Sequence, residues 1–105
     1  MTESQPVVNL IRLDDFCAVS FDTTSSALKA EKILKEAGVE FITIPTPREV
    51  TASCGLSVKV RPENADNTCE MLRSQEIPVR SVIRITNRNG KREVLPLNAG
   101  DSAAP

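Results

Sequence analysis

The sequence contains no histidine, and this absence excludes several kinds of site. Ser-His and Cys-His catalytic pairs are impossible, and no CxxC motif is present among the three cysteines. A structural zinc ion usually takes four Cys or His ligands, so the chain has too few ligands for a zinc site of its own. Any nucleophile must therefore be activated by a fixed charge, a helix dipole or backbone amides. We expect no metal and no cofactor.

Long apolar runs and a charge excess are also missing. No apolar run approaches the ~20 residues that span a bilayer, and the N-terminus lacks the basic and apolar regions of a signal peptide. The formal net charge is only -1. No aromatic residue for base stacking follows Phe41, so the basic stretch 73–92 is interpreted as a solvated strand face. We expect a cytoplasmic protein that binds neither membranes nor nucleic acid.

Aromatic residues are scarce, so the core must be aliphatic. They make up 3% of the chain, whereas hydrophobic residues make up 40%. A length of 105 residues leaves room for one domain. We expect a single domain over residues 7–97, with its core at 16–86, between flexible tails at 1–6 and 98–105.

Apolar periodicity predicts six strands and two helices. The strands are expected at residues 7–13, 16–21, 39–44, 56–61, 79–86 and 92–97, and the helices at 26–37 and 62–74. Clean alternation in 56–61 predicts that Ser57 and Lys59 face away from the core. Asn89-Gly90 is typical of a hairpin turn between the last two strands.

The order β-α-β-β-α-β over residues 16–86 predicts an α+β fold. A ferredoxin-like sandwich has this order, with two helices on one face of a four-stranded antiparallel sheet. The segments 7–13 and 92–97 would then be extra strands. The helices should bury their small apolar faces against one side of the sheet. The residues expected there are Ala27, Ala30, Leu34, Ala65 and Leu72.

Residues 45–55 form the most informative stretch, Pro-Thr-Pro-Arg-Glu-Val-Thr-Ala-Ser-Cys-Gly. Its two prolines restrict the loop to few conformations. Cys54 follows Arg48 by six residues and directly precedes a glycine. One interpretation is a reactive thiolate, stabilised by Arg48 and the loop amides and hydrogen-bonded by Thr51 and Ser53. The other is a small buried thiol, which is common for free cysteine.

Further candidate residues lie at the start of the first helix. Thr23 and Thr24 either bind an anion at the helix N-terminus or simply cap the helix. The sequence leaves open whether this helix end meets Cys54. Cys17, in a strand, and Cys69, on an apolar helix face, are expected to be core residues.

Two stretches together resemble a known family. They are Phe21-Asp22-Thr23-Thr24-Ser25-Ser26-Ala27 with Glu31, and Pro45-Thr46-Pro47-Arg48 with Ser53-Cys54-Gly55. Over residues 16–80 the chain resembles the selenium/sulfur carrier protein-like domains. The resemblance implies that Cys54 carries a persulfide or perselenide. It also implies donor and acceptor proteins for the transferred atom, and leaves sulfur and selenium as alternatives.

The leading hypothesis is therefore a carrier rather than an enzyme. Cys54 would hold the chalcogen and Arg48 would stabilise the anion. The expected ligand-binding residues are Thr46, Thr51, Ser53, Gly55, Thr23 and Thr24. Two alternatives remain: a non-catalytic interaction or assembly domain, and a small-molecule sensor of ferredoxin-like fold. Either would be compatible with a homo-oligomer.

Overall fold

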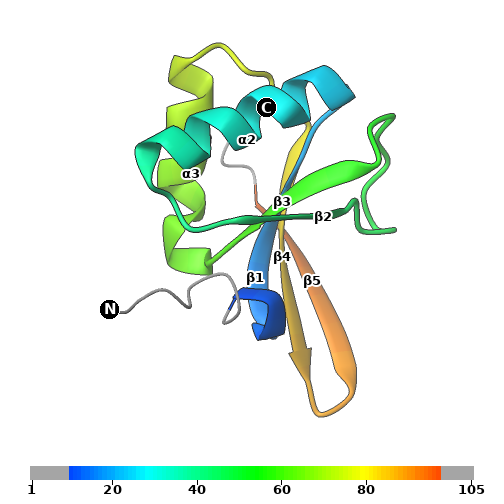
Figure 1. The fold of residues 1–105 in the computed structure, drawn as a ribbon. Coiled ribbons are helices and arrows are strands. Elements are labelled where there is room, and N and C mark those ends of the chain that lie inside the picture. The colour runs from blue at the N-terminus through cyan, green and yellow to red at the C-terminus, as the bar shows by residue number, and fades with distance from the viewer. Residues whose placement is uncertain (1–9, 98–105) are drawn as a thin grey trace.

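The computed structural model describes residues 10–97 and has an α+β fold (Figure 1). The strands are β1 (Asp15–Ser20), β2 (Ile42–Pro45), β3 (Leu56–Val60), β4 (Ser81–Arg88) and β5 (Lys91–Leu97), and the helices are α2 (Thr24–Ala37), the 3₁₀ helix η1 (Pro62–Asn64) and α3 (Ala65–Ser74). The expected tails at 1–6 and 98–105 lie outside the described residues.

All five strands form one antiparallel sheet in the order β2-β3-β1-β4-β5. The chain passes from β1 through α2 to β2, and β3 lies between these two strands. It passes from β3 through α3 to β4, and β1 lies between them. The predicted α+β class, antiparallel sheet and extra C-terminal strand are confirmed.

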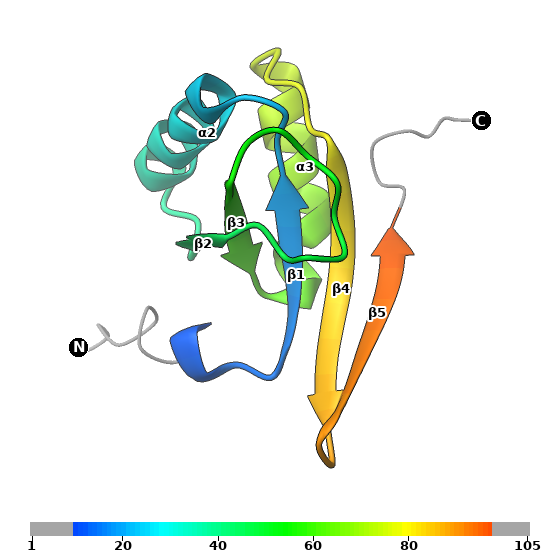
Figure 2. The ribbon, with the colours of Figure 1, turned by 90° about the vertical axis from the view of Figure 1, so that its right-hand side faces the viewer.

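The two faces of the sheet are covered differently. Figures 1 and 2 show α2 and α3 on one face, and Figure 2 shows the loop of residues 46–55 crossing β1 and β4 on the other. Side chains alternate along a strand. In β1, Cys17 and Val19 therefore join the helix-side core, whereas Phe16 and Ala18 join a smaller cluster on the loop side.

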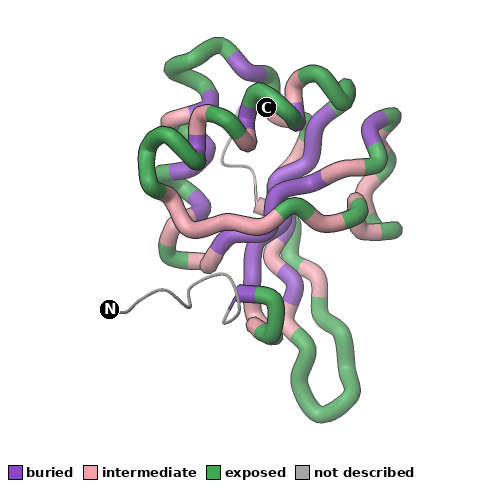
Figure 3. The backbone as a smooth tube through the Cα atoms, viewed as in Figure 1, coloured by how far each residue is buried: buried purple, intermediate pink, exposed green. Residues whose placement is uncertain are grey.

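The helix-side core is aliphatic, as the composition predicts. Its helical members include all five of the expected residues: Ala27, Ala30, Leu34, Ala65 and Leu72. Each is at most 2% exposed. Figure 3 shows the buried positions recurring along α2 and running through β1 and β3. Phe21 is the one aromatic residue in this cluster.

The ends of α2 follow from local sequence. The Thr23 hydroxyl accepts a hydrogen bond from the Ser26 amide at 3.0 Å, which caps the first turn. Gly38 ends the helix with a φ of 76°, a left-handed conformation that glycine adopts without strain. The sequence placed the first helical residue two positions later than the structure does.

The prediction of a strand at 7–13 is wrong for its described part. Residues 10–12 are helical, and the Leu13 amide donates to the Leu10 carbonyl at 3.2 Å. Leu10 and Leu13 are three residues apart, a spacing that also suits a helical turn. Leu10 is fully buried, so the segment packs as a short helical cover rather than as a strand.

Ser57 and Lys59 were predicted to face away from the core, but both are buried. They lie on the loop side of β3, and that side is itself covered. The Lys59 ammonium lies 4.2 Å from the centre of the Phe16 ring and donates to the Ile11 carbonyl. Alternation gave the correct face of the strand, but it could not show that a loop and a helical turn cover that face.

Candidate functional site at Cys54

The loop that carries Cys54 is closed at its base. The Thr46 amide donates to the Gly55 carbonyl at 2.9 Å, so the two ends of residues 46–55 lie side by side. Within the loop, the Val50 amide donates to the Pro47 carbonyl at 3.0 Å. A compact surface loop with adjoining ends is a frequent carrier of functional residues.

The Cys54 sulfur lies where this loop, β3 and α2 meet. It accepts a hydrogen bond from the Leu56 amide at 3.4 Å, and as a thiol it donates one to the Leu56 carbonyl at 3.6 Å. The Thr24 hydroxyl oxygen is 3.7 Å from the same sulfur. Cys54 is only 2% exposed, yet Thr24 and the flanking Ser53 and Gly55 are exposed. The sulfur is therefore buried directly beneath surface residues.

The helix end beside this sulfur favours negative charge. Thr23 caps α2 through its side chain, and its carbonyl accepts from the Ala27 amide. The first turn of α2 contains no acidic residue. The positive end of the helix dipole therefore acts on the nearby sulfur, and the carboxylate just before the cap, Asp22, is paired with Arg80 at 3.6 Å. The question that the sequence left open is answered, because Thr24 and Cys54 do meet. A thiolate here would accept hydrogen bonds from the Leu56 amide and the Thr24 hydroxyl.

A row of hydroxyl groups supports the Cys54 backbone. Thr46 donates its hydroxyl hydrogen to the Cys54 carbonyl at 3.0 Å. A hydroxyl has one hydrogen, so Ser57, 2.9 Å away, must donate to Thr46. Ser20, 2.8 Å from Ser57, donates in turn to Ser57. Ser20 was not predicted as a site residue, although a polar residue in an otherwise apolar strand was the available signal.

Arg48 lies elsewhere. It is exposed and lines a hollow on the loop side of the sheet, together with Phe16 and Ile85. Within residues 10–97, its side chain makes no hydrogen bond or ion pair with Cys54. Arg48 therefore lies on the loop side of the sheet, whereas the Cys54 side chain packs with the helix-side core.

Thr51 and Ser53 are likewise exposed, and in the described chain neither side chain hydrogen-bonds to the Cys54 sulfur. Thr51 contributes its carbonyl instead, which accepts from Arg80 at 3.2 Å. Among the described residues, the polar groups that reach the sulfur are the Thr24 hydroxyl and the amide and carbonyl of Leu56.

The other two cysteines have a different environment. Cys17 and Cys69 are each 1% exposed within the helix-side core. Burial raises the pKa of the Cys17 thiol to about 11, and burial also raises the pKa of Cys69. Both stay neutral thiols at physiological pH, as expected for core residues.

Arg92 of β5 and Arg80, the residue before β4, hold the loop against the sheet. Arg92 forms a two-pronged ion pair with Glu49, at 2.7 and 3.0 Å. The hydrogen bonds from Arg92 lower the pKa of Glu49 to about 2. Val50 packs against the loop-side cluster that contains Phe16 and Ile85. The loop is thus fixed by one ion pair, one carbonyl contact and one partly buried valine.

The fold and the site define a small α+β domain with one buried cysteine between a helix N-terminus and a closed loop. Comparison with known families shows the family of this chain. The model described as "putative Se/S carrier protein-like" matches residues 16–84, so the chain belongs to that family. Neither the comparison with curated proteins nor that with solved structures finds a match.

Residues 10–97 include no group of three or more Cys, Asp or Glu side chains arranged to bind a metal ion. In the same part of the chain, no helix is long and apolar enough to cross a bilayer.

Proposed function

We propose that this protein carries sulfur or selenium on Cys54, as a persulfide or perselenide, between a donor and an acceptor protein. The observation that supports this most directly is the position of the Cys54 sulfur. It contacts the Leu56 amide and the Thr24 hydroxyl at the N-terminal end of α2. Family membership supports the same function.

The chemistry is a thiol exchange that needs no external oxidant. The Cys54 thiolate attacks the outer sulfur of a persulfide on the donor. A new S–S bond forms on Cys54, the donor's S–S bond breaks, and the donor leaves as a thiolate. An acceptor thiolate then takes the outer atom from Cys54 in the same way. The Thr24 hydroxyl and the Leu56 amide stabilise negative sulfur in both steps.

Burial of the sulfur would protect a persulfide on Cys54 from other thiols. A persulfide on an exposed cysteine would lose its outer sulfur to any thiol in solution. Cys54 is 2% exposed, so transfer requires loop 46–55 to move. The Glu49–Arg92 pair and the Arg80 contact to Thr51 are both exposed, and exposed pairs are weak. We infer that a docked partner displaces this loop.

The loop residues have distinct proposed roles. Thr46 and the hydrogen bond to Gly55 fix the loop base, while Thr23 shapes the helix end. Thr51 and Ser53 would contact the partner, since both are exposed next to the sulfur. Arg48 would stabilise an anion, although away from Cys54. The protein would act as a carrier without turnover of its own.

We also propose a ferredoxin-like fold extended by β5. The interleaving of the two β-α-β units in the order β2-β3-β1-β4 supports this assignment. We place the protein in the cytoplasm, where cysteines stay reduced, because all three of its cysteines are unpaired.

The test is sulfur loading followed by mass spectrometry. Incubation with a cysteine desulfurase and cysteine should add the mass of one sulfur to the peptide that contains Cys54. Cys54→Ser should abolish the gain, while the matched variant Cys69→Ser should retain it. Thr24→Val, which removes the hydroxyl at nearly constant volume, should slow loading without abolishing it.

The burial of Cys54 also fits a second candidate function. If Cys54 is only a structural corner, wild-type protein will gain no sulfur and Cys54→Ser will unfold the domain. That result would replace the carrier by a non-catalytic interaction domain. A folded Cys54→Ser variant beside an unloaded wild type would also end the carrier proposal.

A further inference from the structure

The loop side of the sheet contains a hollow of about 480 Å³ whose lining does not include Cys54. Phe16, Ile44 and Ile85 line it from three different strands, and Pro47 and Arg48 line it from the loop. Arg92 of β5 also lines it. The volume lies within the roughly 300–1,000 Å³ range typical of small-molecule sites.

The strand residues of this hollow are apolar and firmly held. Phe16 is 8% exposed and Ile85 is fully buried, and both belong to the loop-side cluster. They lie on the paired central strands β1 and β4, whose register places Phe16 opposite Ile85. A ligand would therefore meet mainly Ile44, Pro47 and the exposed edge of Phe16, which the firmly packed Ile85 supports from below.

The charged groups of the hollow are unequally paired. Arg92 is bound to Glu49 through two hydrogen bonds. Arg48 makes no hydrogen bond or ion pair with any residue in the range 10–97, although its charge helps to lower the pKa of Glu49. One guanidinium beside the apolar surface therefore has all its donors available.

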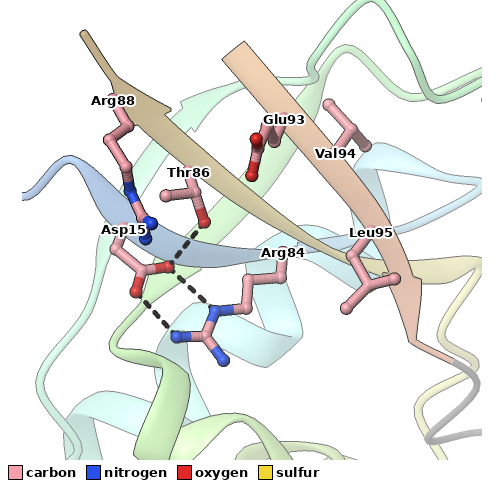
Figure 4. A pocket seen from close by; sticks show the side chains of 7 residues that line it. All are labelled: Asp15, Arg84, Thr86, Arg88, Glu93, Val94 and Leu95. Carbon is pink, nitrogen blue, oxygen red and sulfur yellow. Dashed lines mark hydrogen bonds and ion pairs between the residues drawn. The ribbon is translucent and has the colours of Figure 1, made fainter. Parts of the chain in front are cut away.

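A second hollow of about 400 Å³ provides a contrast (Figure 4). There, Arg84 and Thr86 both point at Asp15, and Arg84 binds its carboxylate at 2.7 and 2.8 Å. The protein itself supplies the anion in that hollow. Arg48 has no such bonded partner, because the neighbouring Glu49 carboxylate is hydrogen-bonded to Arg92.

We propose that the hollow at Arg48 binds a small organic carboxylate with an aryl or alkyl body. The apolar body lies on Ile44, Pro47 and the edge of Phe16, and the carboxylate pairs with Arg48, whose planar donors match two carboxylate oxygens. Cys54 does not line the hollow, but the two sites share a loop residue, because Thr46 lines the hollow and also donates to the Cys54 carbonyl.

The proposal can be tested by NMR titration of ¹⁵N-labelled full-length protein with 4-phenylbutyrate. The largest amide shifts should fall on Phe16, Ile44, Arg48 and Ile85. The uncharged 4-phenylbutanamide should bind about tenfold more weakly, the ratio expected for one well-made charged hydrogen-bonded pair. Acetate, which lacks the apolar body, should produce no saturable shift at these amides.

Two variants distinguish binding of the carboxylate by Arg48 from a general effect of positive charge on the protein. Arg48→Gln should weaken 4-phenylbutyrate binding about fivefold or more, while its unliganded spectrum stays close to wild type. Arg88→Gln removes an exposed arginine from the second hollow and should leave the affinity unchanged.

Three outcomes would overturn the proposal. They are unchanged affinity in Arg48→Gln, shifts centred outside the hollow, and no shift up to the solubility limit of the ligand. Shifts at the same amides that depend on protein concentration alone would assign the hollow to a second copy of the chain, and sedimentation would then detect the dimer. Sulfur loading of Cys54 serves as the separate test of the proposed function.

Discussion

The two faces of the sheet differ in how many residues they bury. The helix-side core joins residues from α2, α3 and three strands into one cluster with little exposure. The loop-side cluster has four buried members, Phe16, Ala18, Ile83 and Ile85, and its cover includes loop 46–55. Stability grows with buried apolar area, so the helix side should carry most of it. The loop side can therefore open at lower cost.

Cys54 lies at the boundary between these two regions. Its side chain packs with the helix-side core, but its backbone belongs to the loop. Access to the sulfur should follow the movement of the loop rather than global unfolding. Local opening of this kind is general for weakly anchored segments. The comparison therefore predicts that mutations on the two faces affect different measurements.

The largest effect is expected for Leu34→Ala in α2. Leu34 is fully buried in the helix-side core, and its truncation should lower the free energy of unfolding by about 2–5 kcal/mol. Circular dichroism during urea unfolding measures this, because the chain lacks Trp and Tyr. If Leu34→Ala lowered the free energy of unfolding less than Val50→Ala does, the helix side would not contribute most of the stability.

The next effect is a loss of stability in alkali. The folded pKa of Cys17 is raised from 9.0 to about 11, so the unfolded thiol ionises first. The stabilising contribution is complete below pH 9 and falls as the pH rises to about 11, by on the order of 2 kcal/mol. Stability should decline less steeply over this range in Cys17→Ala. Parallel declines in the two proteins would refute the assignment, since their lysines are the same.

Val50→Ala is expected to lower the free energy of unfolding less than the two changes above. It should, however, raise the alkylation rate of Cys54. Val50 is half-buried against the loop-side cluster, so the cost should be about 1 kcal/mol. Alkylation of Cys54 should accelerate while that of Cys17 stays slow, as followed by mass spectrometry. Val79→Ala is the matched control, because Val79 is also half-buried but packs on the helix-side core. Equal acceleration in both variants would mean that the loop does not control access.

The smallest effect is expected for Glu49→Gln, which removes the ion pair with Arg92. The folded pKa of Glu49 is lowered from 4.5 to about 2, so its stabilising contribution is present above pH 4.5 and disappears as the pH falls to about 2. The difference in stability between wild type and Glu49→Gln should narrow over that range. At neutral pH the variant should speed Cys54 alkylation less than Val50→Ala does. A constant difference across the range would show that the pair does not hold the loop.

The fold was largely predictable because local signals agreed with one another. Helical spacing of Ala27, Ala30 and Leu34 predicted the buried face of α2, and Asn89-Gly90 predicted the hairpin of β4 and β5. Both signals depend on the chain near the residue. The prediction of a strand at Leu10 was wrong because a short apolar run fits either a strand or a helical turn. Packing against the rest of the molecule decided between them.

The candidate site was predictable only in part. The sequence by itself determined that the chain forms an α+β fold with an aliphatic core, that it lacks histidine chemistry, and that Cys54 lies in a proline-restricted polar loop. These follow from composition and from neighbouring residues. Only the tertiary structure decided that Thr24 meets the Cys54 sulfur while Arg48 turns to the opposite side of the sheet. Such contacts depend on how distant strands pair and on which face each loop covers, and neither is encoded in the spacing of residues along the chain.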